Sequence, residues 1–90
     1  MFNVYVLFSD NYKRTYTGMT IDVAKRLREH NSNQNISTKA YAPWRVIFEK
    51  QYNTRIEARE SEKYLKSGIG REFIKSLILS QNKRPRGATE

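Results

Sequence analysis

The stretch FNVYVLFS, residues 2 to 9, most constrains the fold, because its β-branched and aromatic residues are typical of a β-strand. Successive side chains of a strand point to opposite faces of a sheet. One face therefore carries Phe2, Val4, Val6 and Phe8, and the other carries Tyr5 and Leu7. The polar turn DNYK follows, and the segment RTYTG after it predicts a second strand that returns beside the first.

The length of this connection decides which residues of the two strands face each other. A four-residue loop pairs Ser9 with Arg14. Leu7 then lies opposite Tyr16, and Tyr5 lies diagonal to Tyr16 on the same face. A three-residue loop would separate the two tyrosines. A shared surface for Tyr5 and Tyr16 therefore requires a loop with an even number of residues.

A helix is predicted from Asp22 to Asn31, and it carries an arginine and the only histidine of the chain four positions apart. Thr20 is the expected N-cap, and Asp22 is favourably placed in the positive first turn. The apolar arc of the helix consists of Ile21, Val23, Ala24 and Leu27. Arg26 and His30 share one stripe at the border of this arc, so we expect them to lie along the surface on which the helix packs.

The segment NSNQNISTKAYAP, residues 31 to 43, is polar and ends in proline, which predicts a mobile loop. The next segment, WRVIFEKQY at residues 44 to 52, alternates and contains β-branched and aromatic residues. This pattern predicts a third strand.

Two helices are predicted after the third strand. Thr54 and Glu57 have the spacing of a capping box, which opens a helix that runs to about Ser67 and is ended by Gly68. The predicted buried side of this helix consists of Ala58, Ser61 and Leu65, with Glu62 at its edge. Apolar residues at positions 73, 74, 77 and 78 predict a last amphipathic helix.

The composition limits the chain to one domain and favours a polyanionic partner. Ninety residues suffice for a single modest core, which we assign to residues 1–79, and the charged segment 80–90 is predicted to be a disordered tail. Seventeen Lys and Arg against nine Asp and Glu give a net charge of +8, which favours nucleic acid. The absence of cysteine excludes disulfides and cysteine metal sites. With neither a leader nor a membrane-spanning apolar run, a cytoplasmic protein that does not bind membranes is expected.

Five separated positions together resemble the GIY-YIG nuclease family. They are carried by NVY at residues 3 to 5, YTG at residues 16 to 18, and then Arg26, His30 and Glu62. The resemblance extends from about residue 2 to residue 75. It is closest to the small standalone members related to the amino-terminal nuclease domain of the bacterial excision-repair C subunit. Further similarities to that group are STK at 37 to 39, PW at 43 and 44, and LKSGIGREF at 65 to 73.

The resemblance implies an α+β fold, with a small three-stranded mixed or antiparallel sheet flanked by helices in the order β-β-α-β-α-α. It also implies hydrolysis of DNA phosphodiester bonds with a divalent metal, Mg²⁺ in the first place and Mn²⁺ as the alternative. The resemblance leaves open whether the pathway is DNA repair, recombination or defence, and whether the DNA is single-stranded, double-stranded or branched. A homodimer is compatible with the sequence.

The resemblance also assigns roles to the five positions. Glu62 matches the metal-binding carboxylate, and Arg26 would stabilise charge on the phosphoryl oxygens. Tyr5 and Tyr16 would position and deprotonate the attacking water. A phenol with a pKa near 10 is a poor base at pH 7, so Tyr5 needs cationic charge or a proton acceptor, and His30 can be that acceptor.

Three further positions carry weaker expectations. Gly18 allows a turn into the following helix, while Thr38 and Lys39 are candidates for phosphate contacts or else belong to a solvated loop.

Each catalytic candidate also has an ordinary structural interpretation. The tyrosines could be half-buried strand residues, Arg26 a surface charge and His30 a cation at a helix end. Glu62 could be an i,i+4 surface partner of Lys66.

Three functions remain open from the sequence. The first is a metal-dependent endonuclease that acts on branched, damaged or foreign DNA. The second is a noncatalytic nucleic-acid-binding module on the same fold, and the third is a protein interaction or dimerisation domain whose basic surface is incidental.

Overall fold

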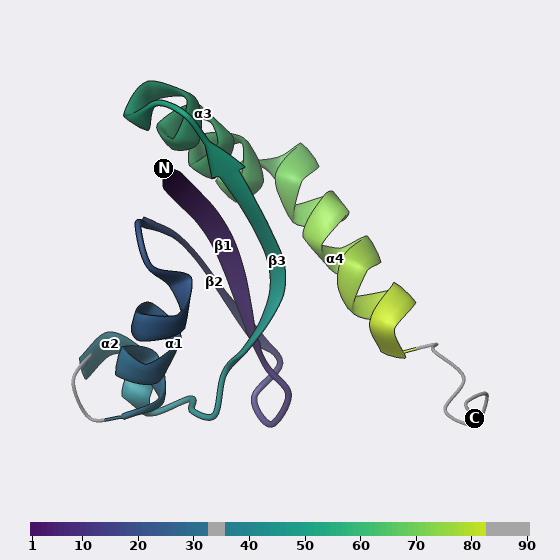
Figure 1. The fold of residues 1–90 in the computed structure, drawn as a ribbon. Helices are drawn as coiled ribbons and strands as arrows, with labels where there is room; N and C mark the ends of the chain where they lie inside the picture. Colours follow the sequence, from purple (N-terminus) through teal and green to yellow (C-terminus); the bar gives the residue numbers. More distant parts are fainter. Residues whose placement is uncertain (33–35, 83–90) are drawn as a thin grey trace, which may run out of the picture.

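The computed structural model describes residues 1–32 and 36–82. Three strands form an antiparallel sheet in the order β2-β1-β3 (Figure 1). The elements, in chain order, are β1 (Phe2–Ser9), β2 (Arg14–Thr20), α1 (Val23–Asn31), α2 (Ile36–Lys39), β3 (Arg45–Tyr52), α3 (Arg55–Lys66) and α4 (Gly68–Asn82). The predicted α+β fold and the predicted order of its longer elements are confirmed. The single turn of helix α2 is an addition within the segment that was predicted to be a loop.

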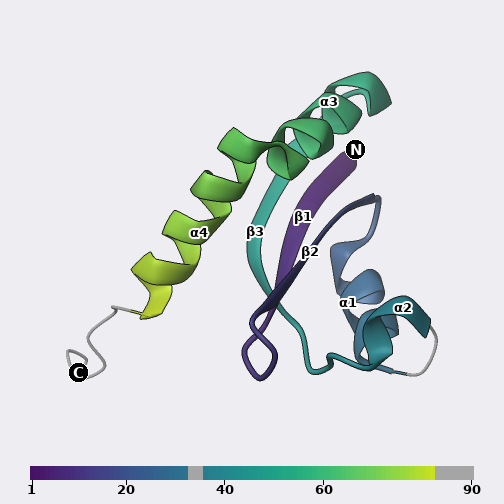
Figure 2. The same ribbon diagram turned by 180° about the vertical axis from the view of Figure 1, so that it is seen from behind.

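Strand β1 is the central strand, and it divides the core into two layers. Residues Asn3 to Ser9 are all buried, because helices cover both faces of the sheet. On one face Val4, Val6 and Phe8 pack with α3 and α4 through Ala58, Leu65 and Ile74. On the other face Tyr5 and Leu7 pack with Val23 of α1 and with Trp44. Figures 1 and 2 show the same arrangement, with α1 and α2 on one side of the sheet and α3 and α4 on the other.

The loop between β1 and β2 has the predicted four residues. Ser9 pairs with Arg14, Leu7 pairs with Tyr16, and Tyr5 pairs with Gly18. The chain reverses at Lys13, whose φ of 56° is positive and whose backbone N–H donates to the Ser9 carbonyl at 2.8 Å. The expected shared face for Tyr5 and Tyr16 is therefore confirmed.

Helix α1 begins differently from the prediction. Asp22, rather than Thr20, is the N-cap, and its carboxylate accepts from the backbone N–H of Lys25 at 3.0 Å. Thr20 instead accepts from the Asp22 N–H at 3.1 Å. Ile21 precedes the cap and so lies outside the helical repeat, which explains why it is 74% exposed instead of buried. Ala24 is also exposed, so only Val23 and the half-buried Leu27 remain of the predicted apolar arc.

Helix α3 begins as predicted and ends differently. Both hydrogen bonds of the Thr54–Glu57 capping box are present. Ser67 is the C-cap, and Gly68 does not end α3 in a loop but is the first residue of α4. Helix α4 continues to Asn82, so residues 80–82 of the predicted tail are helical, and residues 83–90 lie outside the described residues. In the part of the chain that the structure describes, no helix is both long and apolar enough to span a membrane.

Gly70 allows helix α4 to start directly against the end of α3. A Cβ atom at this position would lie 2.5 Å from the Leu65 Cα and would also collide with the Tyr64 carbonyl oxygen. Backbone atoms cannot rotate away as a side chain can, so the two helices would have to separate. Gly68, two residues earlier, has no atom within 4 Å of an added Cβ.

We therefore predict that Gly70→Ala lowers the free energy of unfolding by about 1–3 kcal/mol, the usual cost of overpacking. Gly68→Ala adds the same methyl group in open space, and its effect is expected to stay within about 1 kcal/mol. Urea unfolding of both variants and the wild type measures the difference. Equal stability of the two variants would contradict the steric account of the α3–α4 junction.

Candidate active site

Tyr5 and Tyr16 lie side by side on the sheet face that α1 covers. Their ring centroids are 6.3 Å apart and the rings are tilted by 39°. Tyr5 is only 1% exposed, whereas Tyr16, on the edge strand β2, is partly exposed. The two phenols therefore differ in their access to solvent, with Tyr5 behind and Tyr16 nearer the surface.

Gly18 makes this pairing sterically possible. It lies directly opposite Tyr5 in the sheet, and an added Cβ would be 2.6 Å from the Tyr5 hydroxyl oxygen and 3.1 Å from Cε2 of Tyr16. The prediction that Gly18 serves a turn into the helix is wrong, because it lies within β2 and has no positive φ. Its function is to leave space for the two rings.

His30 of α1 completes an aromatic cluster with the tyrosines. The ring is 1% exposed, and its centroid is 4.7 Å from that of Tyr16. Its Nε2 is 3.3 Å from the Tyr5 hydroxyl, and its Nδ1 is 2.7 Å from the Thr38 hydroxyl. Burial lowers the pKa of His30, and the nearby positive charge of Arg26 lowers it further, while Glu29 acts in the opposite direction. This buried, neutral ring differs from the exposed helix-end cation that was the alternative.

The pKa of Tyr5 bears on which ring nitrogen of His30 carries the proton. Burial raises the pKa of Tyr5 to about 12, and the neighbouring Tyr16, Glu62 and Glu29 also raise it, while Arg26 lowers it. Tyr5 therefore keeps its proton at neutral pH and is able to donate it to Nε2. A neutral imidazole has one N–H, so in the tautomer in which Nε2 accepts from Tyr5, this N–H lies on Nδ1 and is donated to the Thr38 hydroxyl oxygen.

Thr38 is held in place by contacts that the sequence did not reveal. The Trp44 indole N–H donates to the Thr38 carbonyl at 2.9 Å. The Asn31 side chain makes two hydrogen bonds to the Trp44 backbone. Its amide N–H donates to the Trp44 carbonyl at 3.1 Å, and its amide oxygen accepts from the Trp44 N–H. These partners are separated by 6 and 13 residues within a segment that has no periodic pattern, so no signal in the sequence pairs them.

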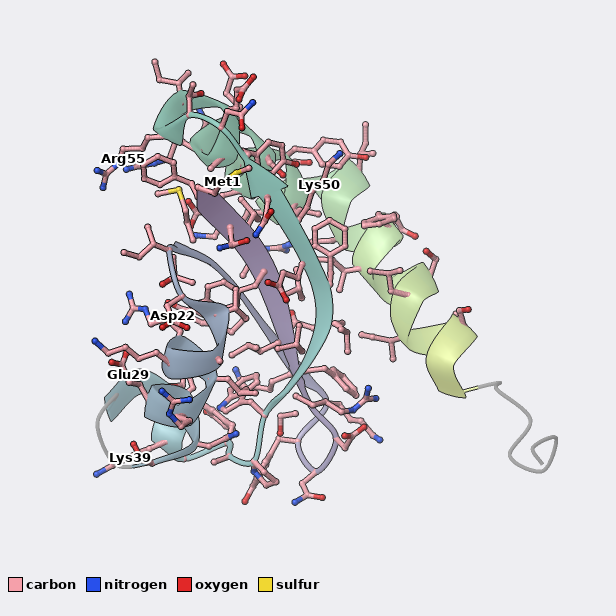
Figure 3. All side chains as sticks on the ribbon, in the orientation of Figure 1. Met1, Asp22, Glu29, Lys39, Lys50 and Arg55 are labelled. Atoms are coloured by element: carbon pink, nitrogen blue, oxygen red, sulfur yellow. The ribbon has the colours of Figure 1, made fainter. Side chains whose placement is uncertain are left out.

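The two predicted phosphate contacts lie in different environments. Thr38 is 3% exposed and bonded to His30, so its hydroxyl is not available to a phosphate. Lys39 is exposed, and Figure 3 shows its side chain extending outward from α2. Thr38 thus lies in the interior beside the catalytic candidates and not on the predicted binding surface.

Arg26 and Glu62 lie near the aromatic cluster, and each has its own charged partner. Arg26 binds Glu29 at 3.2 Å, and Glu62 binds Lys66 at 3.1 Å, the i,i+4 pair that the sequence suggested. The Glu62 side chain is 18% exposed, so it is more covered than an ordinary surface carboxylate. Both residues act on the pKa of Tyr5: Arg26 lowers it and Glu62 raises it.

Two tyrosines from neighbouring strands, joined to a histidine of the next helix, are the arrangement expected of a small GIY-YIG nuclease domain. The chain belongs to this family, because the model of the GIY-YIG catalytic domain matches residues 1–72. It is also similar to a UPF0213 protein of Cupriavidus necator, with 36% identity over 73 residues, which is 77% of this chain and 79% of the relative. No solved structure matches the chain at a significant level.

We predict that Gly18→Ala disturbs the aromatic cluster, because the added methyl group displaces the Tyr5 ring. The free energy of unfolding should fall by about 1–3 kcal/mol. The pKa of Tyr5, measured from the ultraviolet absorbance of its phenolate, should decrease from about 12 as burial relaxes. Tyr5→Phe identifies this step in the titration, and Gly68→Ala is the control for the methyl group itself. An unchanged Tyr5 titration in Gly18→Ala would contradict the steric role of Gly18.

Proposed function

We propose that this protein is a metal-dependent endonuclease that hydrolyses DNA phosphodiester bonds. The catalytic groups would be Tyr5, Tyr16, Arg26, His30 and Glu62. The observation that carries the proposal is the 3.3 Å contact between the Tyr5 hydroxyl and Nε2 of His30, buried against Tyr16. Membership of the GIY-YIG family supports a nuclease-type function in general.

The hydrogen bond from Tyr5 to His30 would give the proton of the attacking water a path to a nitrogen base. With a pKa of about 12, Tyr5 is not ionised at neutral pH and cannot alone remove a proton from water. His30 is neutral there, because burial lowers its pKa. As Tyr5 takes a proton from the attacking water, it transfers its own proton to Nε2 of His30, and an imidazolium forms. Thr38 holds Nδ1 throughout, so the ring does not have to turn.

Tyr16 and Arg26 would act on the water and on the phosphate. Tyr16 is partly exposed next to Tyr5, so its hydroxyl is able to position a water that enters from solvent. The planar guanidinium of Arg26 is always protonated and suits the phosphoryl oxygens on which negative charge develops. Arg26 also lowers the pKa of Tyr5, which favours release of the phenol proton, and it lowers the pKa of His30, which opposes uptake of that proton.

Glu62 fits a hard divalent cation. Mg²⁺ prefers oxygen ligands and usually keeps several waters, so one carboxylate together with substrate oxygens is sufficient. Lys66 contacts Oε2 of Glu62 and is itself exposed, so a divalent cation can displace it from the carboxylate. Across residues 1–32 and 36–82 no group of three or more His, Cys, Asp or Glu side chains could hold a metal, so Glu62 would be a lone acidic ligand. The bound ion, Mg²⁺ or Mn²⁺, would neutralise charge on the phosphate.

A noncatalytic nucleic-acid-binding module is the second candidate, and the net charge of +8 favours it. Two of the site residues argue for catalysis instead. Tyr5 and His30 are each 1% exposed and bonded to each other, so they contribute little surface to passive binding. Two buried titratable side chains that are hydrogen-bonded to each other and have shifted pKa values are typical of functional sites.

We predict that the wild type cleaves supercoiled plasmid and branched or flap DNA with Mg²⁺ or Mn²⁺ and that EDTA stops the reaction. Glu62→Gln and Arg26→Ala should lower the rate at saturating DNA by at least about a hundredfold, as loss of a charge-stabilising group does in other enzymes. Glu60→Gln is the matched control, because it removes an exposed carboxylate two residues away on the same helix. Circular dichroism verifies that all variants are folded.

Cleavage at equal rates by the wild type, Glu62→Gln and Arg26→Ala would contradict the proposal that these residues form the active site. DNA binding by all three proteins without any cleavage would favour the noncatalytic module. Binding of neither DNA nor metal, together with dimerisation, would favour the interaction domain.

A further inference from the structure

A groove with a basic lining runs between the edge strand β2 and helix α4. It consists of two adjoining hollows of about 320 and 380 Å³, which share Thr15, Arg71 and Ile74. We call it the β2–α4 groove and define it by Thr15, Thr17, Lys66, Arg71, Ile74 and Lys75. In Figures 1 and 2 the C-terminal end of α4 lies away from the sheet.

The helix side of the groove carries positive charge that is not neutralised. Arg71 and Lys75 are exposed, and among the described residues neither has an ion-pair partner. They are four positions apart on α4, so they are neighbours on one helix face, separated by about 6 Å along the axis. Two adjacent unpaired cations attract a ligand with regularly spaced negative charges.

The strand side of the groove offers uncharged hydrogen-bonding groups. Thr15 and Thr17 alternate with Tyr16 along β2, so their side chains lie on the face away from the aromatic cluster. Strand β2 is at the edge of the sheet, and in the described part of the chain its outer side has no strand partner. Hydroxyls and free backbone N–H groups are frequent contacts of phosphate oxygens. A sugar-phosphate backbone therefore matches both sides of the groove.

The groove is continuous with the candidate active site. Tyr16 lines its inner hollow, and so does Lys66, whose ammonium group binds Glu62 at 3.1 Å. A nucleic-acid strand bound at Tyr16 and Glu62 would therefore continue past Arg71 and then Lys75. This continuity favours a nucleic acid over an acidic peptide, since the proposed reaction already places a phosphodiester at the inner end.

We propose that the β2–α4 groove binds the sugar-phosphate backbone of the nucleic-acid strand on one side of the scissile phosphate. This inference rests on the proposed function and extends it, because it assigns substrate binding to residues outside the catalytic cluster. Arg71 and Lys75 contact successive phosphates, and the two threonines contact the same backbone from β2. Such contacts carry affinity without base readout, so cleavage has little sequence preference at these positions.

The test compares two double variants of identical chemistry. Arg71→Ala with Lys75→Ala removes the cations of the groove. Arg59→Ala with Lys63→Ala removes an arginine and a lysine at the same i,i+4 spacing from α3, where both are exposed and lie outside the groove. Fluorescence anisotropy with a labelled DNA oligonucleotide in EDTA measures affinity over a series of salt concentrations. Single-turnover cleavage at saturating DNA with Mg²⁺ measures the chemical step separately.

The groove variant should lose at least about tenfold in affinity at low salt, and its slope of log K against log salt should become shallower by about 1 to 2. The α3 control should keep the slope of the wild type. In single-turnover cleavage at saturating DNA the α3 control should match the wild type, because Arg59 and Lys63 belong neither to the catalytic cluster nor to the groove.

Equal losses of slope in the two double variants would overturn the proposal, because net charge alone would then explain binding. A groove variant that binds like the wild type would also overturn it, even if cleavage by Tyr5 and Glu62 is demonstrated. Displacement of the DNA by polyglutamate at equal charge concentration would overturn it in favour of an acidic protein. Groove-dependent binding without cleavage by any protein would support the groove and contradict the proposed catalysis.

Discussion

The buried hydrogen bond between the Tyr5 phenol and the His30 imidazole depends on four segments of the chain at once. β1 supplies Tyr5, α1 supplies His30, β2 supplies the space at Gly18, and α2 supplies the Thr38 hydroxyl on the far side of the ring. A buried polar group without a partner costs about as much as several ordinary contacts gain. The fold on this side of the sheet is therefore specified by the hydrogen bonds of buried polar side chains as well as by apolar packing.

Burial and the charged residues around this hydrogen bond set the pKa values of its two partners. Desolvation raises the pKa of Tyr5 and lowers that of His30, so both groups are neutral in the resting protein. Arg26 and Glu62 act on Tyr5 with opposite signs, and each is paired with a residue on its own helix. Under the proposed function, a substrate phosphate or a cation that replaces these partners would change the pKa of Tyr5. Binding and proton transfer would thereby be coupled through electrostatics without a large movement of the backbone.

Local patterns predicted the parts of the structure that local physics determines. Strand alternation and a four-residue loop were sufficient to place Tyr5 beside Tyr16, and the capping box located the start of α3. The N-cap of α1 was wrong by two residues, because Thr20 and Asp22 are both good caps and only the course of the chain decides between them.

The support of His30 was not predictable in the same way. Thr38, Trp44 and Asn31 are joined across a segment without hydrophobic periodicity, so their pairing exists only in the tertiary structure. The catalytic candidates themselves were found from their resemblance to a family, since a lone Arg or Glu on a helix is indistinguishable from a surface charge. The direct start of α4 at Gly68 was missed for a related reason. Glycine after a helix usually indicates a loop, and only the tight approach at Gly70 reveals a second helix packed on the first.

The most direct test of the account is the protonation state of the His30 ring, read from its nitrogen chemical shifts by NMR as the pH is lowered from 8. At neutral pH the ring should be neutral, with its proton on Nδ1 and with Nε2 accepting from Tyr5. Protonation should begin only below the ordinary histidine pKa of about 6.5, because burial and Arg26 lower the pKa. Tyr5→Phe should shift the Nε2 signal, since its donor is lost. A ring with its proton on Nε2, or one already charged at neutral pH, would contradict the account, because His30 could not then receive the proton of Tyr5.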